Sequence, residues 1–224
     1  IKKLNPKLIN AVLKKIFINI KSLNKKNISK NSIPVWLNKI LENNKLDFNA
    51  IIKNSSTEPS LHLVFKNKNF LLSFGEDYIQ TSLNSAFIVN KKKIIEIDKY
   101  KDGQWWIQDF SSMLPILLSP ELKFKKILDM CAAPGGKAFQ VLSLGADVTL
   151  NDINKKRIVK LNENLKRLRF DEQVLNLNGL NISESHKYDV VIIDSPCSGI
   201  GTIRRNPEIL FKKIPPNFDN LNDM

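Results

Sequence analysis

The stretch Ile127–Lys137, ILDMCAAPGGK, decides the fold that we expect for this chain. Its first four residues resemble the short apolar run of a buried parallel strand, and Gly135-Gly136 permits a tight turn before a helix beginning near Lys137. A strand, a glycine turn and a helix N-terminus together point free backbone N–H groups at a ligand. Neither G-x-G-x-x-G nor G-x-x-x-x-G-K-[ST] can be read here, so we expect a ligand other than a nucleotide pyrophosphate.

Strands and helices alternate from this stretch onward, which predicts a parallel, doubly wound α/β sheet. Ligands of such sheets bind at the carboxyl ends of the strands. The expected strands are 126–130, 146–151, 173–177 and 188–194, and the expected helices are 137–144 and 154–169.

Two polar features follow the strands of this sheet. Asp152 ends the second strand about twenty residues after the glycine loop, where a carboxylate takes the ribose hydroxyls in dinucleotide-type folds. The alternative role for Asp152 is the N-cap of the next helix, and the two roles are compatible. In the stretch DSPCSG, Pro196 stiffens the turn that holds Asp194 and Cys197 at the carboxyl end of the fourth strand. A thiol there could attack an electron-poor ring carbon, and the alternative is a buried structural cysteine.

The first half of the chain shows different patterns. Residues 8–20 predict an amphipathic helix, 21–32 a linker, and 33–41 a second helix. Trp36 could stack on a base, but a core anchor is the favoured role. Residues 51–97 predict a small α+β module with strands at 61–65, 70–74, 87–89 and 94–97 and a possible helix at 78–85. We interpret His62 as a packed or surface histidine rather than a metal ligand.

A further strand and helix are expected just before the sheet. Residues 105–107 are strand-like, and Asp109 can cap a helix that runs to Leu118.

Composition sets the broad class of the protein. The 224 residues carry a formal charge of +13, and the Lys and Arg excess is taken to be spread along the chain. Such a charge favours RNA or DNA as partner, although an AT-rich genome would also enrich Lys, Asn and Ile. Two cysteines, no signal peptide and no membrane-spanning run predict a soluble, monomeric, cytoplasmic protein without a metal site, and both ends indicate a fragment.

Two motifs then carry a family resemblance. CAAPGGK at 131–137 and DSPCSGIGTIRRNPEI at 194–209 resemble the NOP/Sun family of RNA 5-methylcytosine methyltransferases, in particular its RsmB type, which acts on 16S rRNA. NPKLINAVLKKI and NSIPVWLNKILE resemble helices at the end of that family's NusB-like RNA-binding domain, and DGQWWIQDFSSM resembles the lead-in to its catalytic domain.

The resemblance implies a Rossmann-like class I methyltransferase sheet of which this chain holds the first four strands. The implied domains are a helical, NusB-like segment at 1–45, a small α+β RNA-binding or linker module at 46–99, and a methyltransferase domain at 100–224.

The same resemblance implies S-adenosylmethionine as cofactor and small-subunit rRNA as partner. The methionine part would lie against the loop, Asp152 would hold the ribose, and Asn178 stands where the family has an Asp near the adenine. Asp194 would lie beside the methyl group and the target base. Cys197 would help to free the methylated product, and Arg204 and Arg205 would contact RNA. The loop residues are Cys131, Ala132, Ala133, Pro134, Gly135, Gly136 and Lys137.

The nucleophile of the resembling enzymes is a second cysteine, in a Thr-Cys motif after the fifth strand. Cys131 and Cys197 are the cysteines of this sequence, so we expect a fragment that does not complete the reaction and leaves the fourth strand as an apolar edge. Two alternatives stay open. One is a cofactor- or RNA-binding protein without catalysis, and the other is a DNA cytosine-C5 methyltransferase that uses Cys197 as nucleophile.

Overall fold

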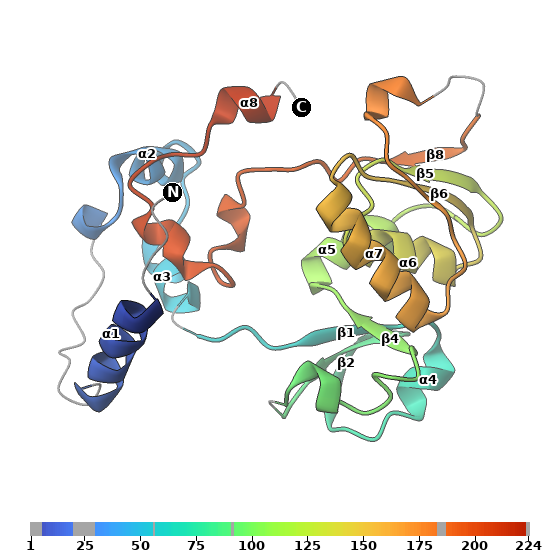
Figure 1. Ribbon diagram of the computed structural model, residues 1–224, viewed down its shortest axis with the longest axis horizontal. Coiled ribbons are helices and arrows are strands. Elements are labelled where there is room, and N and C mark those ends of the chain that lie inside the picture. Colours follow the sequence, from blue (N-terminus) through green and yellow to red (C-terminus); the bar gives the residue numbers. More distant parts are fainter. Residues whose placement is uncertain (1–5, 20–29, 56, 91, 183–186, 223–224) are drawn as a thin grey trace. The chain divides into compact units, whose positions relative to one another are not determined.

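The computed structural model describes residues 6–19, 30–55, 57–90, 92–182 and 187–222 (Figure 1). The chain divides into two compact units. Unit 1 comprises Ile1–Thr57 and Ile200–Pro215, and unit 2 comprises Glu58–Gly199 and Pro216–Met224. None of the described helices combines the length and the apolar character that crossing a membrane requires. The predicted linker 21–32 falls mostly outside the described residues, which resume with a short 3₁₀ turn at Lys30–Ser32.

Unit 2 contains the predicted parallel sheet. Its order is β7-β6-β5-β8, so the strand that leads into the glycine loop lies in the interior of the sheet. Ile127 of β5 pairs with Val148 of β6 and with Val190 of β8. Within the described residues β8 has a strand neighbour on one side only, and Val191 is 47% exposed, as the expected apolar edge requires. The strands are β5 Lys126–Asp129, β6 Asp147–Asn151, β7 Val174–Leu175 and β8 Val190–Ile192.

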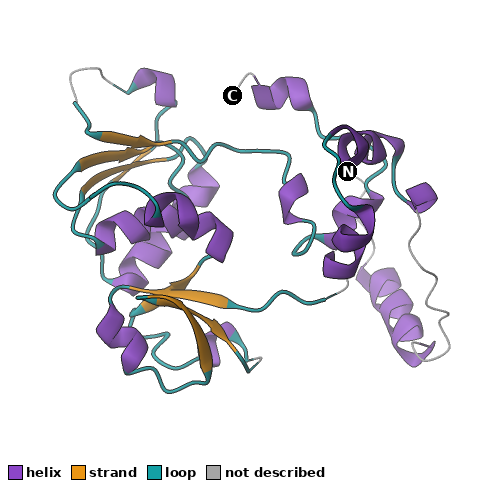
Figure 2. Cartoon of the chain, turned by 180° about the vertical axis from the view of Figure 1, so that it is seen from behind, coloured by secondary structure: helices purple, strands orange, loops and turns teal. Residues whose placement is uncertain are grey.

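Three helices cover one face of this sheet and separate it from a smaller sheet (Figures 1 and 2). They are α5 Phe110–Leu117, α6 Gly136–Ser143 and α7 Lys155–Leu168. In α7 Leu161, Leu165 and Leu168 are spaced by one helical turn and are all buried, because they form the apolar stripe that packs onto the sheet. Asp109 accepts a hydrogen bond from the backbone N–H of Ser111 and caps α5, as predicted. A short helix, α8 Phe218–Asn222, also belongs to unit 2.

The smaller sheet of unit 2 is antiparallel, with the order β2-β3-β1-β4. Its fourth strand, β4, comes from beyond residue 99, and the division of the chain at residues 45 and 99 stays a prediction. His62 of β1 is fully buried: its Nδ1 lies 2.7 Å from the carbonyl oxygen of Gln108 and its Nε2 2.8 Å from Thr81 Oγ1. It is a packed histidine. The strands are β1 His62–Phe65, β2 Tyr78–Ser82, β3 Ser85–Ile88 and β4 Trp105–Ile107.

Three predictions for this module were wrong. The expected strand at 70–74 is instead helix α4, Lys68–Leu72, because Asn67 Oδ1 accepts a hydrogen bond from the backbone N–H of Phe70 and caps the helix. The expected strand at 94–97 is a 3₁₀ turn, Ile94–Glu96. The suggested helix at 78–85 is a hairpin, which the side chain of Asn84 supports by donating to the carbonyl oxygen of Phe65.

Unit 1 contains α1 Pro6–Asn19, α2 Val35–Asn43, α3 Phe48–Ser55 and the segment Ile200–Pro215. The first two helices were predicted and α3 was not. The segment includes the 3₁₀ turns Ile200–Thr202 and Pro207–Phe211. It packs onto α2 and α3 through one buried cluster, whose members are Ile33, Leu37, Leu41, Phe48, Ile203, Ile209 and Leu210.

The two units differ strongly in charge. Unit 1 has 16 Lys and Arg against 3 Asp and Glu, whereas unit 2 has 19 of each. The expectation that the basic excess is spread along the chain was therefore wrong. It was missed because unit 1 is assembled from two stretches that lie far apart in the sequence.

Candidate functional site

The loop between β5 and α6 is fixed by contacts to its neighbours. The backbone N–H of Ala132 donates to the carbonyl oxygen of Asn151 at 2.9 Å, which ties the loop to the end of β6. From α7, the guanidinium of Arg157 donates to the carbonyl oxygen of Ala133, and Asn164 Nδ2 donates to that of Pro134 at 3.1 Å. The peptide bond between Ala133 and Pro134 is cis. Hydrogen bonds to the end of β6 and to α7 therefore fix the backbone of this loop.

Gly135 is required at the turn into α6. Its φ is +120°, a region that residues with a side chain rarely adopt, and a Cβ at this position would lie 1.9 Å from the Phe139 ring. The predicted tight glycine turn is present.

Asp152, which directly follows β6, contacts this loop. The residue is 2% exposed, and its Oδ2 accepts a hydrogen bond from the backbone N–H of Ala133 at 3.2 Å. Its Oδ1 accepts from the backbone N–H of Asn154 at 2.8 Å, and an Arg157 nitrogen lies 3.5 Å from Oδ2. The N-cap of α7 is Asn154, not Asp152, because Asn154 accepts from the backbone N–H groups of Lys156 and Arg157. Asp152 therefore connects the loop after β5 to the end of β6.

A second polar contact joins the start of α6 to the end of β8. Lys137 Nζ donates to Asp194 Oδ2 at 2.6 Å and to Ser112 Oγ at 3.2 Å. The Lys137 side chain is 13% exposed and that of Asp194 is 61% exposed. Cys197, three residues further along the same loop, is exposed. The structure thus brings Lys137 and Asp194 together and leaves the Cys197 thiol accessible.

Asp129 is a site residue that the sequence analysis missed. It is 1% exposed, and Oδ1 is a buried atom without a hydrogen-bond partner among the described residues. Burial is the main cause that raises its pKa from 3.8 to about 7, with Asp194 and Asp152 acting in the same direction. The backbone N–H of Cys131 and the charge of Lys137 oppose this shift. The available signal was an Asp inside an otherwise apolar strand, since fully buried carboxylates are rare unless they are paired.

The thiol of Cys131 is half-buried in the loop. Burial first, and then the charges of Asp152 and Asp129, raise its pKa above the ordinary value of 9.0. The thiol is therefore held in its protonated, unreactive form at neutral pH, which fits a packed residue rather than a nucleophile.

The remaining predicted residues lie after β7 or in unit 1. Asn178 is exposed in the turn after β7, and its Oδ1 accepts a hydrogen bond from the backbone N–H of Leu180 at 3.1 Å. The next residue, Gly179, lies close to the loop, because a Cβ there would be 2.4 Å from Met130 Cε. Arg204 and Arg205 belong to unit 1, so their assignment to RNA stays a prediction.

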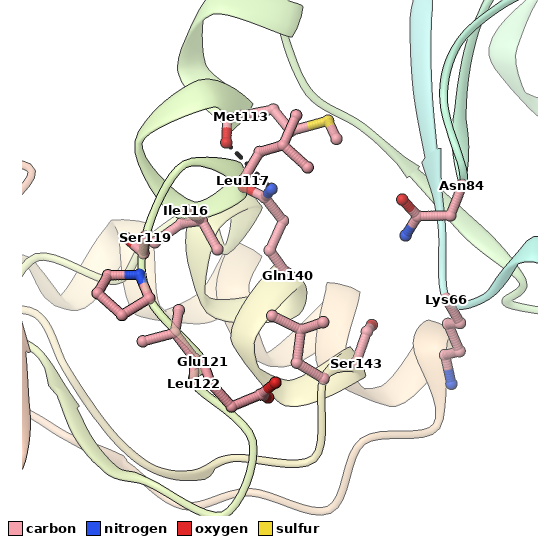
Figure 3. A pocket seen from close by; sticks show the side chains of 12 residues that line it. Lys66, Asn84, Met113, Ile116, Leu117, Ser119, Glu121, Leu122, Gln140 and Ser143 are labelled. Atoms are coloured by element: carbon pink, nitrogen blue, oxygen red, sulfur yellow. Dashed lines mark hydrogen bonds between the residues drawn. The ribbon is translucent and has the colours of Figure 1, made fainter.

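Two cavities adjoin the helices of unit 2. One, of about 560 Å³, has Ser111, Ser112, Lys137 and Asp194 among its lining residues and continues along β8. The other, of about 280 Å³, lies where Lys66 and Asn84 face Met113 and the α6 residues Gln140 and Ser143 (Figure 3).

Several polar groups of the second cavity are engaged within the protein, whereas the buried Ser143 Oγ has no hydrogen-bond partner among the described residues. Gln140 donates to the carbonyl oxygen of Met113 at 3.3 Å, and Lys66 donates to that of Leu168 and lies 4.2 Å from the centre of the Phe170 ring. Only the first cavity adjoins the loop and Asp194.

Known proteins resemble this chain in sequence and in fold. Residues 115–224 match the family model described as "16S rRNA methyltransferase RsmB/F". The chain is 34% identical over 127 residues to "Ribosomal RNA small subunit methyltransferase B" of Photorhabdus laumondii, an alignment that covers 54% of this chain and 30% of that protein. The protein of the same name from Shewanella oneidensis is 28% identical over 223 residues, which cover 91% of this chain and 51% of that protein.

These coverages mean that the chain spans about half the length of such relatives or less.

Among solved structures, the "Crystal Structure of PH0851" is similar with a TM-score of 0.72 at 20% identity, covering 94% of this chain and 53% of the other. This likeness supports the fold described above, including the predicted Rossmann-like sheet.

Proposed function

Through residues 115–224 the chain belongs to the RsmB/F family of 16S rRNA methyltransferases, and from that membership we propose that it is part of an S-adenosylmethionine-dependent RNA methyltransferase. The methyl acceptor is C5 of a cytosine, and the partner is RNA of the small ribosomal subunit. The finer parts of this proposal rest on the CAAPGGK and DSPCSG motifs and on the arrangement of the loop, Asp152 and Asp194.

One observation carries the cofactor assignment. The carboxyl groups of Asp129, Asp152 and Asp194 lie at the ends of three neighbouring strands, and the charges of Asp152 and Asp194 both raise the pKa of Asp129. S-adenosylmethionine bears a sulfonium and an ammonium group, both cationic, and such groups are favoured beside carboxylates in a buried site.

The unpaired Oδ1 of Asp129 provides a specific test of whether the site suits S-adenosylmethionine. A buried oxygen without a partner costs free energy until a donor reaches it, and the cofactor's ammonium group is such a donor. Lys137 supplies the opposite charge, for the cofactor's carboxylate. The residues present therefore fit S-adenosylmethionine.

The chemistry divides between the cofactor and the chain. S-adenosylmethionine supplies a methyl group activated by bonding to a positively charged sulfur. Asp194, exposed beside the loop, is placed to orient the target cytosine, and its contact with Lys137 holds the carboxylate at the end of β8. Cys197 assists release of the methylated base. In this proposal neither Cys131, which is packed within the loop, nor Cys197, which assists release, is the attacking group.

The test uses the longer protein with 16S rRNA and S-adenosylmethionine labelled in its methyl group. We expect the label in 5-methylcytidine when the RNA is digested and its nucleosides are identified by mass spectrometry. Substituting Asp194→Asn should lower the rate at least tenfold, whereas Asp102→Asn, at an exposed turn of the same unit, should leave it unchanged. Label in another nucleoside, or none, would refute the proposed reaction.

A second substitution tests whether Cys197 releases the product, as in the resembling RNA methyltransferases, or attacks the base, as in the DNA-type mechanism. In the longer protein, Cys197→Ala should still form the bond to the base but release the product slowly, so a covalent RNA–protein adduct accumulates on a denaturing gel. Loss of both the adduct and methylation would identify Cys197 as the attacking group and favour the DNA-type mechanism.

A further inference from the structure

The whole basic excess of the chain resides in unit 1, and this distribution needs a cause. A compositional bias of the genome acts on the whole gene, so it would enrich Lys in both units alike. Unit 2 is instead balanced, with 19 basic and 19 acidic residues, while unit 1 has 16 against 3. A concentrated positive charge on one folded unit attracts a polyanion.

Within unit 1, one groove combines an aromatic wall with flanking lysines. It has a volume of about 490 Å³ and lies between the start of α2 and the end of the segment Ile200–Pro215. Its lining residues are Pro34, Val35, Trp36, Lys39, Lys213 and Pro215.

The indole of Trp36 is held in place rather than free. Its Nε1 donates to the carbonyl oxygen of Lys212 at 2.8 Å, which fixes the ring to the opposite wall of the groove. Leu37 and Leu41 of the same helix are 0% and 3% exposed in the core of unit 1, so α2 is itself anchored. One part of Trp36 packs against this core, and the residue is only partly buried and lines the groove.

We propose that this groove binds an unpaired nucleotide of RNA, with the base against the Trp36 ring and the adjacent phosphates near Lys39 and Lys213. The proposal rests on the proposed action on RNA and adds a contact site in unit 1, made of other residues than the cofactor loop of unit 2. Stacking on an aromatic ring tolerates any base, and lysines follow the backbone, so the site recognises single strands with little sequence preference. An apolar peptide would use the walls of the groove but would not require the lysines or the charge of the unit.

The three tryptophans make a selective measurement possible. Trp105 and Trp106 are 0% and 2% exposed, so a ligand that quenches the fluorescence by stacking reports on Trp36. A single-stranded oligouridine of about ten nucleotides, within the site sizes known for such proteins, should quench the fluorescence as it binds. Inorganic polyphosphate of equal charge should bind unit 1 without quenching. An oligouridine that binds without quenching, or equal quenching by polyphosphate, overturns the proposal.

Variants of the groove distinguish a role of Trp36 in stacking on a base from a role in packing within the protein. Trp36→Leu should weaken oligouridine binding about tenfold, whereas Trp36→Phe should keep it within about threefold, because phenylalanine retains the stacking surface. The double variant Lys39→Gln with Lys213→Gln should reduce the salt dependence of binding while the quenching at saturation persists. Equal weakening by Trp36→Leu and Trp36→Phe, with thermal unfolding unchanged in both, contradicts the stacking role.

These measurements need no cofactor, so the two proposals can fail separately. Quenching together with absence of methyl transfer in the longer protein would leave the nucleotide site standing and reject the proposed reaction. Methyl transfer by a protein that shows no quenching would reject the nucleotide site and leave the proposed reaction standing.

Discussion

The substitution Gly135→Ala is expected to lower the free energy of unfolding of unit 2 by about 3 kcal/mol and to abolish cofactor binding. Two costs add at this position. The backbone φ of +120° strains a residue with a side chain, and the new methyl group would lie 1.9 Å from the Phe139 ring. That ring cannot move freely, because it is 2% exposed and packs against the rings of Trp106 and Phe170.

Urea unfolding followed by tryptophan fluorescence measures this effect, since Trp105 and Trp106 both report on unit 2. The matched control is Gly75→Ala in the same unit, which has no positive φ and whose Cβ would lie 3.2 Å from the end of the Asp98 side chain, and it should change stability by less than about 1 kcal/mol. If the two alanine variants had the same stability as the unchanged chain, the turn would not have the role described here.

The substitution Asp129→Asn is expected to stabilise the protein above pH 7 and to weaken cofactor binding at the same time. The folded-state pKa of about 7 lies above the ordinary value of 3.8, so the folded chain binds more protons than the unfolded chain between these values. The contribution of this carboxyl to stability is therefore fully present below about pH 4 and is lost as the pH rises to 7 and above, by at most roughly 4 kcal/mol. The neutral amide removes this loss, and it also removes the charge that attracts a cationic ligand.

Unfolding free energies measured from pH 4.5 to 8 test this expectation. The Asn variant should match the unchanged chain near pH 4.5 and exceed it by about 2–4 kcal/mol at pH 8. Asp102→Asn, which removes an exposed carboxylate from the same unit, should show no such dependence. A stability difference that does not vary with pH would mean that the Asp129 carboxyl does not titrate between the two ends of this range.

The sequence predicted the parallel sheet because its strands are continuous apolar runs followed by polar loops, a pattern with one reasonable interpretation. It failed in the smaller sheet, where apolar runs of four or five residues fit a strand and a buried helical turn equally well. At residues 70–74 the cap at Asn67 decided the outcome in favour of a helix.

The candidate site was predictable to the extent that local motifs define it. The glycine turn, Asp152 and Asp194 could be found by their position after a strand. For Asp129 the sequence offered only an Asp in an otherwise apolar strand, because its burial and its unpaired oxygen depend on neighbouring elements of the sheet and the helices. The charge of unit 1 was also hidden, since it depends on the return of residues 200–215 to the N-terminal helices.

The most direct test of the central claim is a calorimetric titration of this chain with S-adenosylmethionine at pH 8 and at pH 5.5. The account predicts saturable one-to-one binding at pH 8, weaker binding at pH 5.5 because Asp129 takes up a proton, and no binding by the Asp152→Ala variant. Absence of heat at pH 8, with the chain folded, would contradict the claim that the loop Cys131–Lys137 holds this cofactor.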